Sequence, residues 1–226
     1  MLEALASPID VVEVYVEADL GADVVDAVAG AADRAGVRVT RVAPDSLAKA
    51  TSPVTPQGVA ALAGIPSRPP EESLRGLVLV QVGVGDPGNA GTIVRVAEAA
   101  GASAVVSCAD AVDPWNPKCI RASAGSLFRV PMLEAGDVGE CAAMLRDAGM
   151  TLVAGDASAE ADYDQVDLRG DVAILLGNEA HGLVDGADAA ADRVVRVPMH
   201  GEVESLNVAM TGAILAFESA RQRRGR

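Results

Sequence analysis

Apolar positions along the chain alternate between strand-like runs and helix-like periods. The first part holds a strand-like run at 11–16, a helical pattern over 22–36 that a glycine ends, and a second strand-like run at 37–43. A short helical stretch at 44–50 and the run 56–64 follow. This order predicts a small α/β unit.

A proline-rich, charged stretch at 64–76 follows this unit and predicts an interdomain linker. From Leu77 onward, strand-like runs and helical patterns alternate, which predicts a parallel sheet covered by helices on both faces. The expected strands lie at 77–82, 104–108, 130–134, 151–156, 172–178 and 194–198, and the expected helices at 92–102, 118–128, 138–150 and 206–224.

The last of these helices carries apolar residues at steps of three and four, from Leu206 through Met210 to Phe217. This spacing predicts one buried apolar face. Two interpretations stay open: the face closes the core of its own domain, or part of it packs against a second subunit.

Composition indicates a globular protein without membrane spans or metal. Half of the 226 residues are hydrophobic, but no apolar run approaches the roughly 20 residues that cross a bilayer. The start of the chain lacks the pattern of a signal peptide, so we expect a cytoplasmic protein. Three cysteines without a C-x-x-C pair and only two histidines favour reduced core thiols and no metal site.

The net charge of -14 excludes proteins that hold nucleic acid by a broad positive field, although a local basic cleft stays compatible with it. The C-terminal run RQRRGR is the one cationic cluster of the sequence, and its plainest interpretation is a solvated helix end. One tryptophan, two tyrosines and two phenylalanines are too few for a base-stacking platform.

A G-x-G-x-x-G pattern at 83–88 follows an apolar run and precedes a helical pattern, as a dinucleotide-binding loop would. Asp110 also lies near the expected place of a ribose-binding acid. However, Asp86 would repel phosphates, and Pro87 removes one backbone donor. An NAD-dependent Rossmann dehydrogenase is therefore the least favoured alternative.

Two polar residues follow this loop. Asn89 is expected to cap the helix that begins here. Arg95 lies between Val94 and Val96 in an otherwise apolar helix. It either extends to solvent or pairs with an acid, or it directs its fork of donors at an anion or a developing oxyanion.

Two later stretches favour a ligand site at the carboxyl edge of the sheet. In LLGNEAHGL, Gly177 frees the backbone to approach a ligand and Glu179 adds a carboxylate. In RVPMHGEVESLNVAMTGA, Ser205 is of the type that caps a helix. Asn207 is a poor helix former, so a purely structural role is less expected there.

Together, GDPGNAGTIVRVAEAAGA, LLGNEAHGL and VPMHGEVESLNVAMTGAILAFE resemble, in order and spacing, the three motifs of the SpoU family of RNA ribose 2′-O-methyltransferases in the SPOUT superfamily. The resemblance implies a knotted methyltransferase domain at 77–226, with a parallel sheet and a C-terminal deep trefoil knot. Residues 1–63 resemble the L30e-like RNA-binding domain of many members, and 64–76 would link the two. In the family, a basic helix and a strand open that domain and would precede what is here Met1, so we expect this domain to be either truncated or reduced.

The resemblance also implies S-adenosylmethionine as cofactor, bound in the knot, and a homodimer formed through the knotted domain. Backbone contacts to the cofactor are expected from Gly177, Val197 and Leu206, with Leu176, Asn178, Met199 and Ser205 nearby.

The implied reaction is methyl transfer to a ribose 2′-hydroxyl in RNA, with ribosomal RNA favoured over transfer RNA. Arg95 matches the arginine of the first motif, and we expect it to stabilise the developing oxyanion and position phosphate. Asn89, Glu179, Ser205 and Asn207 match the other polar motif positions and are expected to orient the nucleotide and its hydroxyl. A dimer that binds cofactor and RNA without turnover is the main alternative.

Overall fold

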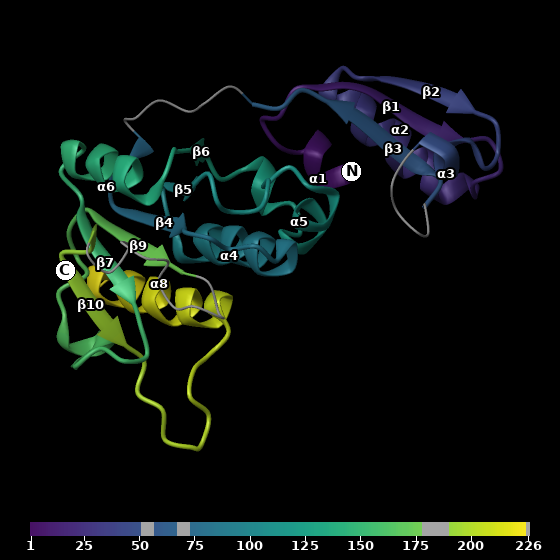
Figure 1. Cartoon of the computed structure of the whole chain (residues 1–226). Coiled ribbons are helices and arrows are strands. Elements are labelled where there is room, and N and C mark those ends of the chain that lie inside the picture. Colours follow the sequence, from purple (N-terminus) through teal and green to yellow (C-terminus); the bar gives the residue numbers. More distant parts are fainter. Residues whose placement is uncertain (51–56, 67–72, 178–189, 225–226) are drawn as a thin grey trace. The chain divides into compact units, whose positions relative to one another are not determined.

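The chain forms two compact units, Met1–Ser67 and Arg68–Arg226, each with its own sheet (Figure 1). None of the described helices is both long and apolar enough to cross a membrane. The computed structural model describes residues 1–50, 57–66, 73–177 and 190–224.

The first unit is built on a three-stranded sheet of order β2-β1-β3, in which β1 runs parallel to β2 and antiparallel to β3. Helix α2 ends at Gly36, whose φ of 69° is the left-handed conformation that glycine adopts without strain. The small α/β unit and the glycine stop are thus confirmed. Its elements are α1 (Leu2–Leu5), β1 (Val11–Glu17), α2 (Ala22–Ala35), β2 (Arg38–Val42), α3 (Ser46–Ala50) and β3 (Val59–Ala63).

The second unit contains a seven-stranded sheet of order β6-β5-β4-β9-β7-β10-β8, and every strand pair in it is parallel. The parallel sheet is confirmed, and the two-residue strand β8 is an addition to the expected set. The strands are β4 (Leu77–Gln81), β5 (Ala104–Ser107), β6 (Met132–Glu134), β7 (Thr151–Gly155), β8 (Ala161–Asp162), β9 (Val172–Leu176) and β10 (Arg193–Arg196). The helices are α4 (Pro87–Ala100), α5 (Pro117–Ala122), α6 (Val138–Asp147) and α8 (Val208–Arg224), with 3₁₀ turns η2 (Ser126–Phe128) and η3 (Tyr163–Gln165).

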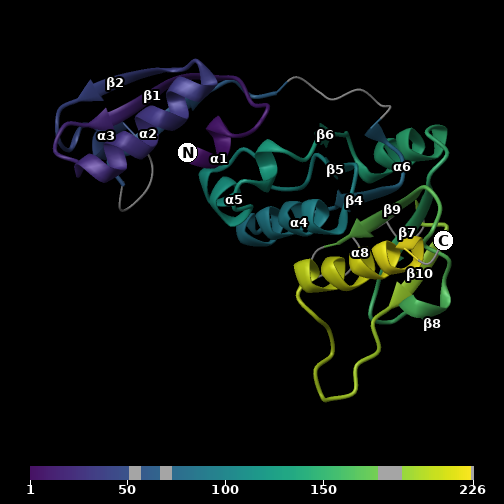
Figure 2. The ribbon, with the colours of Figure 1, turned by 180° about the vertical axis from the view of Figure 1, so that it is seen from behind.

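Helices cover both faces of this sheet, as expected. Leu77 and Leu79 of β4 belong to the core that packs against α4, α5 and α8, whereas Val78 and Val80 belong to the core on the side of α6. Since both sets are fully buried, the strand is an unbroken apolar run rather than an alternating one. Figures 1 and 2 both show α4 and α8 side by side on one face of the sheet.

Helix α8 buries a different face from the predicted one. Met210 and Phe217 are 60% and 46% exposed, so the interpretation that this face closes the core of its own domain is wrong, and the interpretation that it packs against a second subunit stays a prediction. The buried positions are mostly small, because the helix packs very closely on the sheet. A Cβ on Gly212 would lie 2.7 Å from Cδ1 of Leu176 in β9.

All three cysteines, Cys108, Cys119 and Cys141, are free and buried, as expected of core thiols. Burial raises the pKa of the Cys119 thiol to about 11, so it stays protonated and poorly nucleophilic near neutral pH. Residues 178–189, which connect β9 to β10, lie outside the described part of the chain, and the trefoil knot stays a prediction.

Candidate active site

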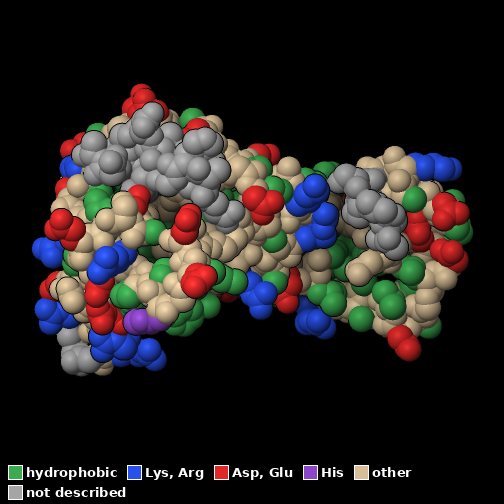
Figure 3. Space-filling model, turned by 60° about the horizontal axis from the view of Figure 1, so that its bottom comes forward, with side chains coloured by type: hydrophobic (Ala, Val, Ile, Leu, Met, Phe, Trp, Pro, Cys, Tyr) green, Lys and Arg blue, Asp and Glu red, His purple; other side chains and the backbone are tan. Residues whose placement is uncertain are grey.

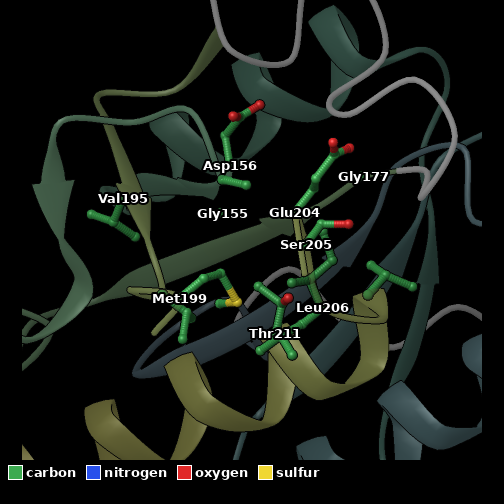
Figure 4. Close-up of a pocket in the computed structure, with 13 residues that line it drawn as sticks. Gly155, Asp156, Gly177, Val195, Met199, Glu204, Ser205, Leu206 and Thr211 are labelled. Atoms are coloured by element: carbon green, nitrogen blue, oxygen red, sulfur yellow. The ribbon is translucent and has the colours of Figure 1, made fainter. Parts of the chain in front are cut away.

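A pocket lies where the carboxyl ends of β7, β9 and β10 meet, the edge at which open α/β sheets bind ligands (Figure 4). Its volume is about 260 Å³. The loop between β10 and α8 and the first turns of α8 supply the remaining walls. The lining residues are Gly155, Asp156, Ala157, Leu176, Gly177, Val195, Val197, Met199, Glu204, Ser205, Leu206, Val208 and Thr211.

Six of the seven residues expected near the cofactor line this one pocket. They come from two stretches that are separated in sequence, one at the end of β9 and the other in the loop that follows β10. The seventh, Asn178, lies outside the described residues. The six are Leu176, Gly177, Val197, Met199, Ser205 and Leu206.

The end of β7 forms one wall of the pocket, and the sequence motifs did not predict this wall. Gly155 and Asp156 line the pocket there. A Cβ on Gly155 would lie 3.1 Å from Cγ2 of Thr211, so the glycine lets α8 approach the strand end closely. The signal was available: a glycine and a polar residue follow the buried run TLVA as they follow VAILL.

A hydrogen bond joins the first motif to the third. The amide nitrogen Nδ2 of Asn207 donates to Oδ1 of Asn89 at 2.9 Å, which ties the start of α8 to the first turn of α4. Oδ1 of Asn207 accepts from the backbone nitrogen of Ala209 at 3.0 Å, so this side chain caps α8. The expectation that Ser205 occupies the N-cap is wrong, since α8 begins at Val208.

The glycine-rich loop at 83–88 is not a phosphate cradle. The carboxylate of Asp86 caps α4 by accepting from the backbone nitrogen of Asn89 at 2.8 Å, and Pro87 follows it in the first turn. Asn89 was expected to be this cap and is not. Asp110 accepts from the backbone nitrogen of Gly83 at 3.1 Å, so it supports the loop instead of meeting a ribose.

Arg95 lies apart from the pocket lining. It is exposed on α4 and makes no hydrogen bond or ion pair with any described residue. Its guanidinium is therefore open to a ligand that approaches from solvent. Glu179, the remaining polar candidate, lies outside the described part of the chain, as does His181.

Over the described ranges, no group of three or more His, Cys, Asp and Glu side chains is placed to hold a metal ion. What the pocket offers is backbone at three strand ends, aliphatic side chains, a thioether and a few oxygens. In Figure 4, Met199 from the loop and Thr211 from α8 face the same space. Such a lining suits a small organic ligand with apolar and polar parts.

Residues 76–217 match the family described as the SpoU rRNA Methylase family, and residues 1–69 match the description "RNA 2′-O ribose methyltransferase substrate binding". The chain is 37% identical over 203 residues to the 23S rRNA (guanosine-2′-O-)-methyltransferase RlmB of Xanthomonas axonopodis pv. citri (strain 306), covering 86% of this chain and 82% of that protein. It is 34% identical over 226 residues to the RlmB of Bordetella pertussis (strain Tohama I), covering 97% of this chain and 92% of that protein.

The same likeness holds in three dimensions. The crystal structure of the SpoU methyltransferase AviRb from Streptomyces viridochromogenes, in complex with the cofactor AdoMet, has a TM-score of 0.83 at 27% identity and covers 99% of this chain and 87% of that one. The two family matches lie one in each structural unit, and the first spans the strands, helices and loops that build the pocket. The chain belongs to the SpoU rRNA methylase family.

Proposed function

We propose that this chain transfers a methyl group from S-adenosylmethionine to a ribose 2′-hydroxyl of ribosomal RNA, with a guanosine of 23S rRNA as the first substrate to try. The observation that carries the proposal is the pocket at the strand ends, which gathers residues of the second and third motifs in a member of a methylase family. Curated relatives are named for the same reaction. Together with this substrate, we propose a cytoplasmic location.

The pocket residues fit the cofactor. Leu176, Val197 and Leu206 offer aliphatic surface for an adenine ring, while Gly177 leaves its backbone open to hydrogen bonds. The hydroxyl of Ser205 is a polar group at the same wall. When bound, S-adenosylmethionine supplies a methyl group activated by a positively charged sulfur.

Around this pocket, the chain must orient a ribose hydroxyl and stabilise the charge it develops. We assign oxyanion stabilisation and phosphate positioning to Arg95, which is exposed on α4 and open to RNA. Asn89 and Asn207 position each other through their hydrogen bond, next to Ser205 in the pocket. Glu179 is assigned a positioning role from its motif alone.

The first unit is proposed to bind RNA, with domains at 1–63 and 77–226 joined by 64–76. Arg34, Arg38 and Arg41 lie on one short stretch of its chain and are exposed. In Figure 3, acidic and basic side chains are interspersed over the face of the Arg68–Arg226 unit turned to the viewer. Specific phosphate contacts, rather than one broad positive area, therefore suit this chain.

The reaction is tested with purified protein, labelled S-adenosylmethionine and 23S rRNA transcripts. We expect calorimetric binding of the cofactor and incorporation of label into ribose 2′-O positions. Binding of cofactor and RNA without incorporation into any ribosomal or transfer RNA would favour the dimer without turnover. Absence of cofactor binding would refute the proposal.

A second copy of the chain is proposed to cover the exposed side of α8. Met210 and Phe217 project from this helix two turns apart, at 60% and 46% exposure. Changing both to glutamate (Met210→Glu, Phe217→Glu) is expected to convert a dimer into a monomer in sedimentation velocity, because charges oppose burial. Val24→Glu, at a 45% exposed position of α2, is the matched control and should leave the dimer intact. A wild-type monomer at all concentrations would contradict the proposal.

A further inference from the structure

The pocket is acidic. Asp156 and Glu204 are the two ionisable residues among its described lining residues, and both are carboxylates. They come from separate segments, the end of β7 and the loop before α8, yet Figure 4 shows both carboxylates on the same side of the pocket. Any ligand in the pocket therefore experiences a negative potential.

Asp156 is fixed in place. Its backbone nitrogen donates to the carbonyl oxygen of Val195 in β10 at 2.9 Å. Its Oδ1 accepts from the backbone nitrogen of Ser158 at 2.7 Å and from the hydroxyl of Ser158 at 2.6 Å. Oδ2 accepts no hydrogen bond from a described residue, so the carboxylate keeps acceptor capacity for a ligand.

No described residue neutralises the charge of Glu204. Glu204 makes no hydrogen bond or ion pair with any residue in the described ranges. Arg196 lines a neighbouring hollow together with Glu204, but its Nε lies 2.8 Å from Oδ1 of Asp162. This arginine is thus engaged elsewhere.

We propose that Asp156 and Glu204 make the pocket select the cationic cofactor S-adenosylmethionine over its product, S-adenosylhomocysteine. This inference rests on the proposed function. The cofactor carries a sulfonium and an ammonium against one carboxylate, for a net charge of +1. When the methyl group leaves, the electrons of the S–C bond stay on sulfur, and the product is a thioether without net charge. The two carboxylates attract the first ligand and lose that attraction for the second.

The consequence is weaker product inhibition, because the incoming cofactor outcompetes the product for the pocket. A pocket that bound both molecules equally would be inhibited by each turnover, since the two share their adenosine and amino-acid parts. Because the pocket is open to water, we expect the effect of each carboxylate to be moderate, roughly fivefold in the dissociation constant.

Calorimetry on the full chain tests this with three ligands: S-adenosylmethionine, S-adenosylhomocysteine and sinefungin, which carries an amine where the cofactor carries its methylated sulfur. Asp156→Asn and Glu204→Gln should each weaken S-adenosylmethionine and sinefungin by roughly fivefold and leave S-adenosylhomocysteine unchanged. Wild-type affinity for the cofactor should also fall with added salt more steeply than that of either variant.

Two controls separate local charge from net charge. Asp147→Asn on α6 and Glu134→Gln on β6 remove carboxylates that are exposed like Glu204 and do not line the pocket, and should change no affinity. An asparagine at position 156 retains an Oδ1 acceptor for Ser158, so the turn is preserved, and thermal unfolding verifies it.

An equal loss of affinity for all three ligands would overturn the inference, because the carboxylates would then contact a part that the ligands share. Unchanged affinities in both variants would overturn it as well. If wild-type protein bound none of the three ligands, the proposed function itself would fail, and this inference with it.

Discussion

Replacing Arg95 with alanine is expected to slow methyl transfer by at least about a hundredfold, the usual cost of losing one group that stabilises a developing oxyanion. The dissociation constant for S-adenosylmethionine should not change, because Arg95 does not line the pocket. The free energy of unfolding should stay the same as well, since the side chain is exposed and makes no hydrogen bond or ion pair with described residues. Single-turnover rates with saturating RNA, calorimetry and thermal unfolding measure the three quantities.

Two further variants make this prediction specific. Arg169→Ala removes an exposed arginine that precedes β9, at the opposite edge of the sheet, and whose surface ion pair with Asp167 adds little stability. It should transfer methyl groups at the wild-type rate. Arg95→Lys keeps the charge without the planar fork and should fall between wild type and Arg95→Ala. A rate for Arg95→Ala within threefold of wild type would remove Arg95 from the catalytic assignment.

Gly91→Ala is expected to destabilise the second unit by about 3 kcal/mol, the upper end of the usual range for overpacking in a rigid core. A Cβ at this position of α4 would lie 2.4 Å from the carbonyl oxygen of Cys119 and 2.9 Å from the backbone nitrogen of Ser123. These are backbone atoms of α5 and of its C-cap residue, so no side-chain rotation relieves the clash, and the two helices must separate. Denaturant unfolding measures the loss.

The matched control lies in α2. A Cβ on Gly30 would find its nearest neighbour, Nη1 of Arg34, at 3.6 Å, an ordinary contact. Gly30→Ala should therefore stabilise the first unit by about 0.5–1 kcal/mol, because alanine is the better helix former. An unchanged unfolding midpoint for Gly91→Ala would mean that α4 and α5 are not as tightly packed as the structure has them.

Helices and strands with a clear hydrophobic pattern or end signal could be predicted from the sequence. The run LVLVQV is a strand that is buried on both faces, and a glycine ends α2 in the left-handed conformation that only a residue without a Cβ adopts freely. In both cases local chemistry and tertiary packing favour the same structure, so the pattern alone is sufficient.

Helix α8 could not be predicted in the same way. The periodicity predicted a buried apolar face with Met210 and Phe217, against either the domain's own core or a second subunit. Within the chain, the buried face instead carries Ala209, Gly212, Leu215 and Ala216. Periodicity weights large side chains, but a helix that approaches a strand end closely must bury small ones. The distance between helix and sheet is a tertiary property, and it decided which face turned inward.

The candidate site was likewise predicted only in part. The motifs predicted the pocket walls that Gly177 and Leu206 form. Asn89 and Asn207 were assigned to one site only by the family resemblance, and the hydrogen bond between them was not predicted. The wall at Asp156 was missed because the resemblance carried no motif there, although a glycine and a polar residue follow the strand-like run in the sequence. The sheet order, which places β7 between β9 and β10, brings it to the pocket.

The carboxylate that caps α4 also keeps free phosphates from binding at the N-terminus of this helix. A bare helix N-terminus after a glycine-rich turn attracts anions, and cells are rich in free nucleotides and inorganic phosphate. Asp86 acts as a permanent internal anion at that position, held by the backbone nitrogen of Asn89. The loop whose sequence resembles a nucleotide-binding loop therefore does not offer the N-terminus of α4 to nucleotides or small phosphates, which cannot compete there with an RNA chain.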